Sequence, residues 1–280
     1  MLFRSDLRGD RIIHDCEYMA VRTAGKPAHD VGFRIEGQKT GHHMDFTPNV
    51  IATPHRVRTV GSFEELTATR FAGDINALCW PRQLPGDFQE IVDRLEAQEG
   101  MTTIGDDDLR ALRLSYAGAV SRDALLADQA LLRDNGLVPI LDCITGYPRD
   151  EQAGPVTTDV YSFHVDRAPV EADTYLCTYI GRSSEGLLNE TAVRRVDVAE
   201  TRARLLTIYG GADDADFAAH LSEHCYDLHY GSLPGAEPYK FGIGNLWRIA
   251  IAYPGCPVLP CIHRAPLTLP GDPARLLLIS

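Results

Sequence analysis

Two short stretches, far apart in the chain, carry side chains that suit metal binding. His164 and Asp166 are two residues apart in the run SFHVD, and His263 stands in the run CIHRAP. On a β-strand, residues i and i+2 point to the same face, so the first two side chains can face one point. Two imidazoles and one carboxylate bind a divalent transition metal ion and leave coordination positions open. The alternative interpretation is that His164 and Asp166 form a hydrogen-bonded pair within the core.

Arg275 begins the last apolar run, RLLLI, which follows a Pro-Gly turn. A buried guanidinium needs a partner, and its planar fork can bind both oxygens of a carboxylate. If the turn makes a hairpin, Arg275 lies opposite Pro266, roughly 10 Å along the strand from His263 at about 3.3 Å per residue. A five-carbon dicarboxylate bound to the metal could span this gap. An interior ion pair with Asp166 or Glu185 is the alternative.

A second histidine group offers a different kind of site. His220 and His224 are four residues apart, so both lie on one side of a helix. Such a pair can hold zinc, with His229 or Asp227 as a further ligand, which would suit a zinc hydrolase. The run HLSEH lacks a glutamate directly after the first histidine, so it does not reproduce the H-E-x-x-H motif. Histidines packed beside the apolar helix face are the other interpretation.

The overall composition narrows the class of partner and the compartment. The chain has 280 residues and a formal net charge of −12, which disfavours nucleic acid or an anionic membrane as an extended partner. It has no apolar run of about 18 residues, and its N-terminus lacks the apolar core of a signal peptide. The seven cysteines form no C-x-x-C pair. We therefore expect reduced thiols, a cytoplasmic location and a small-molecule partner.

The elements that must position these residues change character along the chain. Helical periodicity dominates the part before residue 136, and alternating strand patterns dominate the part after residue 146. This outline predicts an α+β protein with a sandwich or barrel, interrupted by one helical insertion. Residues 1–60 are predicted to be an N-terminal extension of strands or a flap, and 61–280 the main domain. The predicted helices cover 88–95, 106–116, 121–135 and 213–230, and the predicted strands cover 137–144, 160–165, 174–180, 246–252, 258–263 and 275–279.

Taken together, Phe163–Asp166, His263–Pro266 and the terminal arginine run resemble the iron(II)/2-oxoglutarate-dependent oxygenase superfamily. More narrowly, the FHVD and HRAP motifs, together with Asp74–Arg82 and Thr178–Gly181, resemble a bacterial family known mainly as a domain of unknown function. The resemblance covers residues from about 60 to the end of the chain.

The resemblance implies a double-stranded β-helix core of the jelly-roll, cupin-like type, with N-terminal helices packed on it. It further implies iron(II) on His164, Asp166 and His263, and 2-oxoglutarate anchored by Arg275. With O2, such an enzyme would form succinate and CO2 and would oxidise a small molecule, with hydroxylation expected and desaturation, cyclisation or demethylation as alternative outcomes. A metal-binding jelly roll without 2-oxoglutarate turnover is the alternative.

Further residues follow from the resemblance as candidates for the same site. Arg264, beside the distal histidine, is a second candidate for binding the cosubstrate or the substrate. Thr178 and Tyr179 lie on the strand after the H-x-D pair, where members of this superfamily often place a hydroxyl near the cosubstrate. Tyr175 and Trp247 are additional candidates for lining the pocket.

Overall fold

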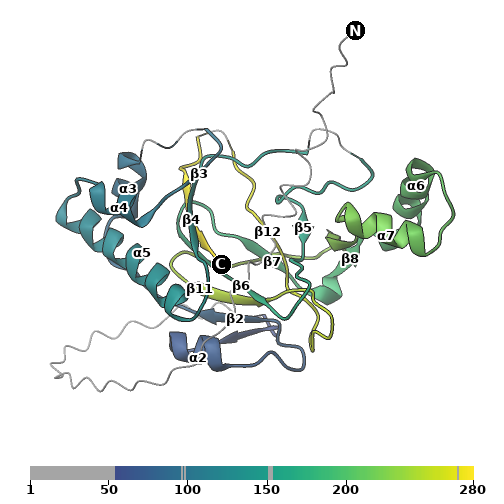
Figure 1. The fold of residues 1–280 in the computed structure, drawn as a ribbon, viewed down its shortest axis with the longest axis horizontal. Coiled ribbons are helices and arrows are strands. Elements are labelled where there is room, and N and C mark those ends of the chain that lie inside the picture. The colour runs from purple at the N-terminus through teal and green to yellow at the C-terminus, as the bar shows by residue number, and fades with distance from the viewer. Residues whose placement is uncertain (1–53, 96, 98, 151–153, 270) are drawn as a thin grey trace, which may run out of the picture.

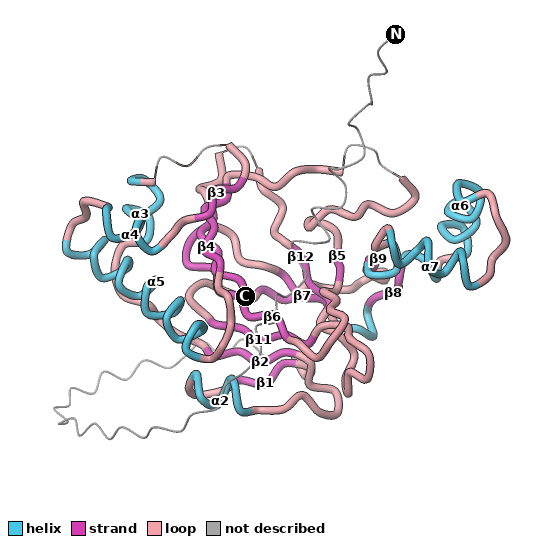
Figure 2. The backbone as a smooth tube through the Cα atoms, in the orientation of Figure 1, coloured by secondary structure: helices cyan, strands magenta, loops and turns pink. Residues whose placement is uncertain are grey.

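Two β-sheets form the centre of the molecule, and helices lie at two opposite sides of them (Figures 1 and 2). This computed structural model describes residues 54–280 except 96, 98, 151–153 and 270. The prediction of an α+β protein is confirmed. Most of the predicted N-terminal extension lies outside the described residues. Its last part, at 57–59, is a strand of the larger sheet and so belongs to the main folded unit.

The larger sheet has seven strands and the smaller sheet has six. In spatial order, the larger sheet contains β1 (Val57–Thr59), β2 (Ala77–Trp80), β11 (Leu246–Ala250), β6 (Asp173–Ile180), β13 (Arg275–Ile279), β4 (Ile140–Ile144) and β3 (Met101–Thr103). The smaller sheet contains β10 (Tyr239–Lys240), β7 (Glu185–Leu187), β12 (Ile262–Arg264), β5 (Phe163–His164), β9 (His229–Ser232) and β8 (Ala192–Arg194).

Consecutive strands repeatedly cross between the two sheets. β4, β6, β11 and β13 belong to the larger sheet, while β5, β7, β10 and β12 belong to the smaller one. Their neighbours within each sheet are antiparallel and far away in sequence, as in the pairings of β13 with β4 and β6. The chain therefore brings the H-x-D stretch and His263 side by side in one sheet, and Arg275 into the other.

The helices α2 (Phe63–Ala68), α3 (Phe88–Arg94), α4 (Asp106–Ala111) and α5 (Tyr116–Asp134) precede β4, whereas α6 (Ala199–Tyr209) and α7 (Ala215–Glu223) follow β8. Leu125 and Leu132 of α5 are fully buried against one face of the larger sheet. The helix begins before the predicted residue 121 because the Ser115 hydroxyl caps it by accepting from the Gly118 N–H.

The helix predicted over 213–230 is correct only in its first half. α7 ends at Glu223, and Cys225 has a left-handed φ of 55°, which an α-helix cannot accommodate. The chain then makes a short 3₁₀ turn and enters β9 at His229. This break moves His229 out of the predicted helix and into the smaller sheet.

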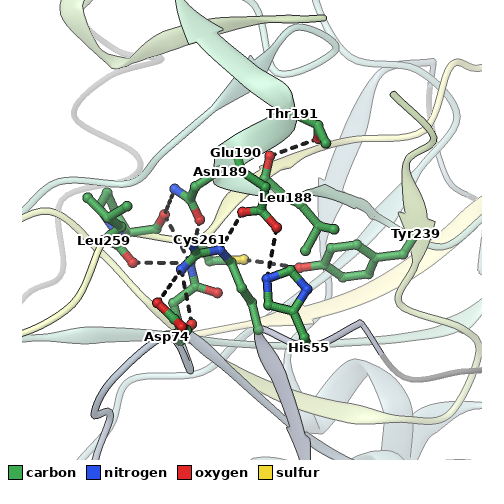
Figure 3. A network of polar contacts seen from close by, with 12 residues as sticks. His55, Asp74, Leu188, Asn189, Glu190, Thr191, Tyr239, Leu259 and Cys261 are labelled. Carbon is green, nitrogen blue, oxygen red and sulfur yellow. Dashed lines mark hydrogen bonds and ion pairs between the residues drawn. The ribbon is translucent and has the colours of Figure 1, made fainter. Parts of the chain in front are cut away.

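Aromatic and aliphatic side chains fill the other face of the larger sheet. Trp247 stacks on Phe241 with ring centroids 4.2 Å apart, and its indole N–H donates to the Phe241 carbonyl over 2.7 Å. A polar network joins the chain just before β2 to loops next to the smaller sheet (Figure 3). There, the buried Asn76 amide donates to Asn189 Oδ1 over 2.8 Å and to the Leu259 carbonyl over 3.1 Å.

Most of the described cysteines carry free thiols. Cys79, Cys143, Cys177, Cys256 and Cys261 are free, whereas Cys225 is disulfide-bonded, so the prediction of reduced thiols is confirmed for these five alone. Within the described residues, no helix combines the length and the apolar character needed to cross a bilayer.

A buried ion pair joins α5 to the larger sheet. Arg82 donates two hydrogen bonds to the Asp128 carboxylate, over 2.6 and 2.8 Å, and the Tyr179 hydroxyl donates to the same carboxylate over 2.6 Å. Removing one partner of such a pair leaves the other charge buried without compensation. The arginine that ends the run DINALCWPR therefore has a structural role.

We expect Asp128→Ala to lower the free energy of unfolding by about 3–5 kcal/mol, because Arg82 would lose its buried carboxylate. Asp123→Ala, which breaks the solvent-exposed pair with Arg122 on the same helix, should cost at most about 1 kcal/mol. Urea denaturation of both variants measures the difference. Equal costs for the two variants would contradict this role for Asp128.

Candidate metal centre

Strand register places three histidines in a row across the smaller sheet. His263 on β12 pairs with His164 on β5, and His164 pairs with His229 on β9. The ring centroids of His164 and His263 are 4.6 Å apart, and those of His164 and His229 are 5.7 Å apart. Asp166 follows two residues after His164. The smaller sheet therefore brings together the three predicted metal ligands and adds a fourth ionisable side chain beside them.

His164, Asp166 and His263 each offer a ligand atom, and these atoms all lie within 4.8 Å of one another. Asp166 Oδ1 is 3.6 Å from His263 Nε2 and 4.0 Å from His164 Nε2. The three residues are only 3–6 % exposed. Over the residues that the structure describes, no second group of three such side chains converges in this way.

Hydrogen bonds to the far side of each ligand fix which atom faces the centre. His164 Nδ1 lies 2.8 Å from the Ser162 carbonyl oxygen, and His263 Nδ1 lies 3.3 Å from the Cys261 carbonyl oxygen. A carbonyl only accepts, so each Nδ1 carries the proton and each neutral Nε2 keeps its lone pair. The Thr174 hydroxyl donates to Asp166 Oδ2 over 2.5 Å, which leaves Oδ1 for the centre. Metal-binding imidazoles and carboxylates are commonly oriented by such partners.

Two of the atoms that face the centre lack partners. His164 Nε2 and Asp166 Oδ1 are buried and have no hydrogen-bond partner. Buried polar atoms are rarely left in this state, because the loss of hydration is uncompensated. Both atoms are electron-pair donors, so neither can satisfy the other. A divalent cation would satisfy both, and the donor set fits iron(II).

The rival histidine pair does not form such a site. His220 and His224 have ring centroids 4.2 Å apart, but His224 is exposed and its Nδ1 lies 3.0 Å from the His220 carbonyl oxygen. The two proposed additional ligands are engaged elsewhere, since His229 lies beside His164 and Asp227 pairs with Arg167 over 3.2 Å. The zinc-hydrolase interpretation therefore lacks its further ligand.

Burial keeps the central histidines neutral. Desolvation, together with the neighbouring His263, lowers the pKa of His164 from 6.5 to about 4. Desolvation, followed by the nearby His164 and Arg195, lowers the pKa of His229 to about 3. Neutral imidazole is the form that binds metals, so the lowered pKa of His164 keeps this ligand in the required state at pH 7.

These two pKa values predict a pH dependence for the metal-free protein. The folded-state pKa values lie below the unfolded value of about 6.5, so on acidification the unfolded chain takes up these protons first. Their contribution to stability is complete above pH 6.5 and is lost as the pH falls through 6.5 towards 4 for His164 and 3 for His229. Each pKa unit corresponds to about 1.4 kcal/mol, so the loss for one histidine is on the order of 3 kcal/mol.

Urea unfolding in the presence of EDTA at pH 7.5 and pH 4.5 measures this loss. We expect His229→Gln to lose less stability between these two pH values than the wild type, because one buried histidine no longer titrates. The exposed His224→Gln variant, its matched control, should follow the wild-type curve. A His229→Gln variant as acid-sensitive as the wild type would contradict the prediction.

Arg275 is buried in the facing sheet and has only neutral partners. Its guanidinium donates to the hydroxyls of Tyr147 over 2.9 Å, Thr178 over 3.1 Å and Ser184 over 2.7 Å, and its Nε is unpartnered. No described carboxylate lies within 4 Å of it. Burial lowers its pKa below the ordinary value of 12.5. The alternative of an interior ion pair with Asp166 or Glu185 is therefore wrong, and the site suits an incoming anion.

Two other predicted contacts are also wrong. Arg264 donates two hydrogen bonds to Glu185, over 2.9 and 2.7 Å, and is therefore not free to bind a cosubstrate. Tyr179 points to the helix-covered face of the larger sheet, where it bonds Asp128, because neighbouring strand residues face opposite sides. Tyr175 lies on that same face. Of the two predicted hydroxyls, only Thr178 reaches Arg275.

The predicted hairpin between His263 and Arg275 does not form. β13 pairs with β4 and β6, whereas β12 pairs with β5 and β7, so these two strands lie in different sheets. Strand β6 nevertheless relates the two sites. Its Thr174 contacts Asp166 and its Thr178, on the same face, contacts Arg275, and four residues span roughly 13 Å. The metal centre and Arg275 thus flank one face of β6.

Sequence reasoning did not identify the hydroxyls of Tyr147, Ser184 and Thr174, which hold the site residues in place. Ser184 directly precedes β7 and Thr174 is the second residue of β6, both in unremarkable polar stretches, and only the fold brings each hydroxyl to its partner. Tyr147 is a partial exception, because a tyrosine directly after the buried strand β4 is a candidate for that end of the sheet.

Two cavities adjoin these residues. One, of about 410 Å³, is bordered by His229, Ser162 and Arg195. The other, of only about 10 Å³, is bordered by Arg275, Tyr147 and Pro266. Leu267 lines both, so the two cavities are neighbours around this side chain.

Comparisons with protein-family models, with curated proteins and with solved structures found no match for this chain. Function must therefore be inferred from the residues of the site and their chemistry.

Proposed function

We propose that this protein is a non-haem iron(II)- and 2-oxoglutarate-dependent oxygenase that oxidises a small molecule, with hydroxylation as the expected reaction. One observation carries the proposal. A buried His-Asp-His group with unsatisfied donor atoms lies across one face of β6 from a buried arginine that has no carboxylate partner. A metal-chelating dicarboxylate would satisfy both ends.

The donor set supports iron(II) at His164, Asp166 and His263, because two imidazoles and one carboxylate leave positions open for further ligands. Iron(II) bound there would supply the redox chemistry with O2. The protein's own part is to hold both Nε2 atoms unprotonated and one carboxylate oxygen free, through the carbonyls of Ser162 and Cys261 and the hydroxyl of Thr174. Burial excludes water from this point.

Arg275 is proposed to bind the far carboxylate of 2-oxoglutarate. Its guanidinium is oriented by three hydroxyls, those of Tyr147, Thr178 and Ser184, none of which neutralises its charge. A carboxylate would restore that charge balance in a low-dielectric site. The overall reaction is balanced: 2-oxoglutarate, O2 and a C–H bond of the substrate give succinate, CO2 and an alcohol.

The winding of the chain supports a jelly-roll core. Eight strands, from β4 to β7 and from β10 to β13, divide equally between the two sheets, four in each. β8 and β9, with α6 and α7, lie between these two groups in sequence and correspond to the proposed helical insertion. Double-sheet jelly rolls, including cupins, consist of eight strands in two Greek keys.

A second candidate is a metal-binding jelly roll without 2-oxoglutarate turnover. The cavity at Arg275 favours this candidate, because about 10 Å³ accommodates roughly one water molecule and no dicarboxylate. For the oxygenase function, the residues 266–268 and 272–273, which border that cavity, have to shift when the cosubstrate enters.

The two candidates differ in a direct assay. Purified protein, reconstituted with iron(II) under anaerobic conditions, is exposed to 2-oxoglutarate and then to air, and succinate is measured. The oxygenase proposal expects iron-dependent succinate formation and, before air is admitted, a weak visible absorption band on adding 2-oxoglutarate. Iron bound at one equivalent without either signal would refute the oxygenase function and support the second candidate.

A further inference from the structure

The cavity of about 410 Å³ beside the metal centre has the size of a small-molecule site and a mainly polar lining. Such sites usually measure about 300–1,000 Å³ and combine apolar walls with a few polar groups. Here the apolar part comes from Tyr161, Tyr230 and Leu267, and the polar part includes Arg149, Arg195 and His229.

The charge at this cavity is opposite to that of the whole chain. The chain carries a formal charge of −12, yet two arginines and one carboxylate, Asp159, line the cavity. Asp159 Oδ1 accepts from the backbone N–H groups of Tyr161 and Ser162, and its Oδ2 lies 4.0 Å from Arg149. No described carboxylate lies within 4 Å of Arg195. The cavity therefore retains one cation that an anionic ligand could neutralise.

His229 connects this cavity to the metal centre. Its ring lies beside His164, with centroids 5.7 Å apart, and it lines the cavity. The Ser162 hydroxyl has one proton, and it donates this proton to the backbone carbonyl of Asp159 over 2.7 Å. The hydroxyl oxygen therefore accepts a hydrogen bond from His229 Nδ1 over 2.8 Å. This contact leaves the lone pair on His229 Nε2. His229 is thus shared by the wall of the cavity and the surroundings of the metal centre.

We infer that this cavity binds the organic substrate, and that the substrate carries a carboxylate or another small anionic group held by Arg195 with help from Arg149. The group to be oxidised lies towards His229 and the metal centre. The role of this cavity as the substrate site rests on the proposed oxygenase function. The binding of an anion in the cavity does not depend on that function.

Benzoate and its uncharged counterpart benzamide make a matched pair of probes, since they differ mainly in charge and suit the tyrosine-lined wall. Ligand-observed NMR on the metal-free protein should show benzoate binding about tenfold more tightly than benzamide, and Arg195→Gln should remove this preference. Arg122→Gln, on the exposed side of α5, should retain it. Arg275→Met should also retain it, which separates this cavity from the proposed cosubstrate site.

A second measurement tests the position of the ligand. In protein loaded with Mn(II), benzoate protons should relax faster than in the metal-free protein, and His164→Ala should abolish the effect. Equal binding of both probes, or an unchanged preference in Arg195→Gln, would overturn the anion site. Binding without paramagnetic relaxation would overturn its role as the substrate site. Arg195-dependent binding in a protein that never forms succinate would contradict the oxygenase function but leave the anion site standing.

Discussion

His164→Ala is expected to lose tight iron binding and, with it, iron-dependent succinate formation. The imidazole presents an unpartnered, buried Nε2 to the same point as Asp166 Oδ1, and alanine offers no donor there. Residues that only orient a metal ligand typically contribute 10–100-fold to metal affinity, so losing a ligand itself should cost more than about 100-fold. Elemental analysis after dialysis measures the iron content, and succinate formation measures turnover.

His224→Ala is the matched control, because this histidine is exposed at the end of α7 and lies outside the group of three ligands. It should retain both iron and turnover. Circular dichroism shows whether either variant fails to fold. A folded His164→Ala protein that keeps one tightly bound iron would disprove the proposed metal centre, whatever its activity.

Asp166→Asn tests the same centre with almost no change of shape. The amide oxygen remains, but the negative charge that balances a divalent cation is gone, so iron affinity should fall although the fold is kept. His263→Ala is expected to behave like His164→Ala. Similar losses at all three positions are expected of ligands that act as one unit.

Local rules predicted that His164 and Asp166 share a face and that His263 lies on a strand, whereas the approach of His263 to this pair is a long-range strand pairing that the resemblance implied. The two-residue spacing fixes the face of a strand, and the apolar run before His263 fixes a second strand. The predicted final strand has the same bounds as β13, Arg275–Ile279, since its five residues are apolar except for the first. Each prediction needs only the nearest neighbours in the chain.

The contacts that were wrongly predicted depend on which strands pair. The expected hairpin between β12 and β13 fails because each strand finds its neighbours in a different sheet, a choice made by contacts distant in sequence. Arg264 became a candidate because it follows His263, yet for that reason it points away from the centre and meets Glu185. His229 was assigned to a helix that the left-handed Cys225 interrupts.

The metal centre and the Arg275 site share one physical property. Their buried side chains are oriented by hydrogen bonds, but their charges and lone pairs are not neutralised. Ordinary cores leave few polar atoms in this state, since each costs free energy without a partner. Five buried side-chain atoms of the described residues lack a partner, and three of them belong to His164, Asp166 and Arg275, the residues assigned to metal and cosubstrate. The metal centre and the Arg275 guanidinium together suit a ligand that has a chelating group at one end and an anionic group at the other.

Arg275→Met is expected to weaken 2-oxoglutarate binding strongly while leaving the ligand-free protein at least as stable as the wild type. Truncating one partner of a buried charged pair costs roughly 2–5 kcal/mol, which corresponds to about 30-fold or more in affinity. Without ligand, however, the guanidinium is a buried cation that no described carboxylate balances, so its removal relieves a desolvation cost. Thermal denaturation of the Mn(II)-loaded protein, with and without 2-oxoglutarate, measures both effects.

Arg264→Met provides a control with the opposite signature. Arg264 is paired with Glu185, so its removal leaves a half-buried carboxylate without its partner and should lower the stability of the ligand-free protein. Its 2-oxoglutarate affinity should stay close to that of the wild type. If Arg275→Met instead destabilised the ligand-free protein as Arg264→Met does, and 2-oxoglutarate still raised its denaturation midpoint, Arg275 would be a structural residue. If Arg275 binds the cosubstrate, Arg275→Met keeps the stability of the ligand-free protein and loses the stabilisation by 2-oxoglutarate. A purely structural role for Arg275 does not predict this combination.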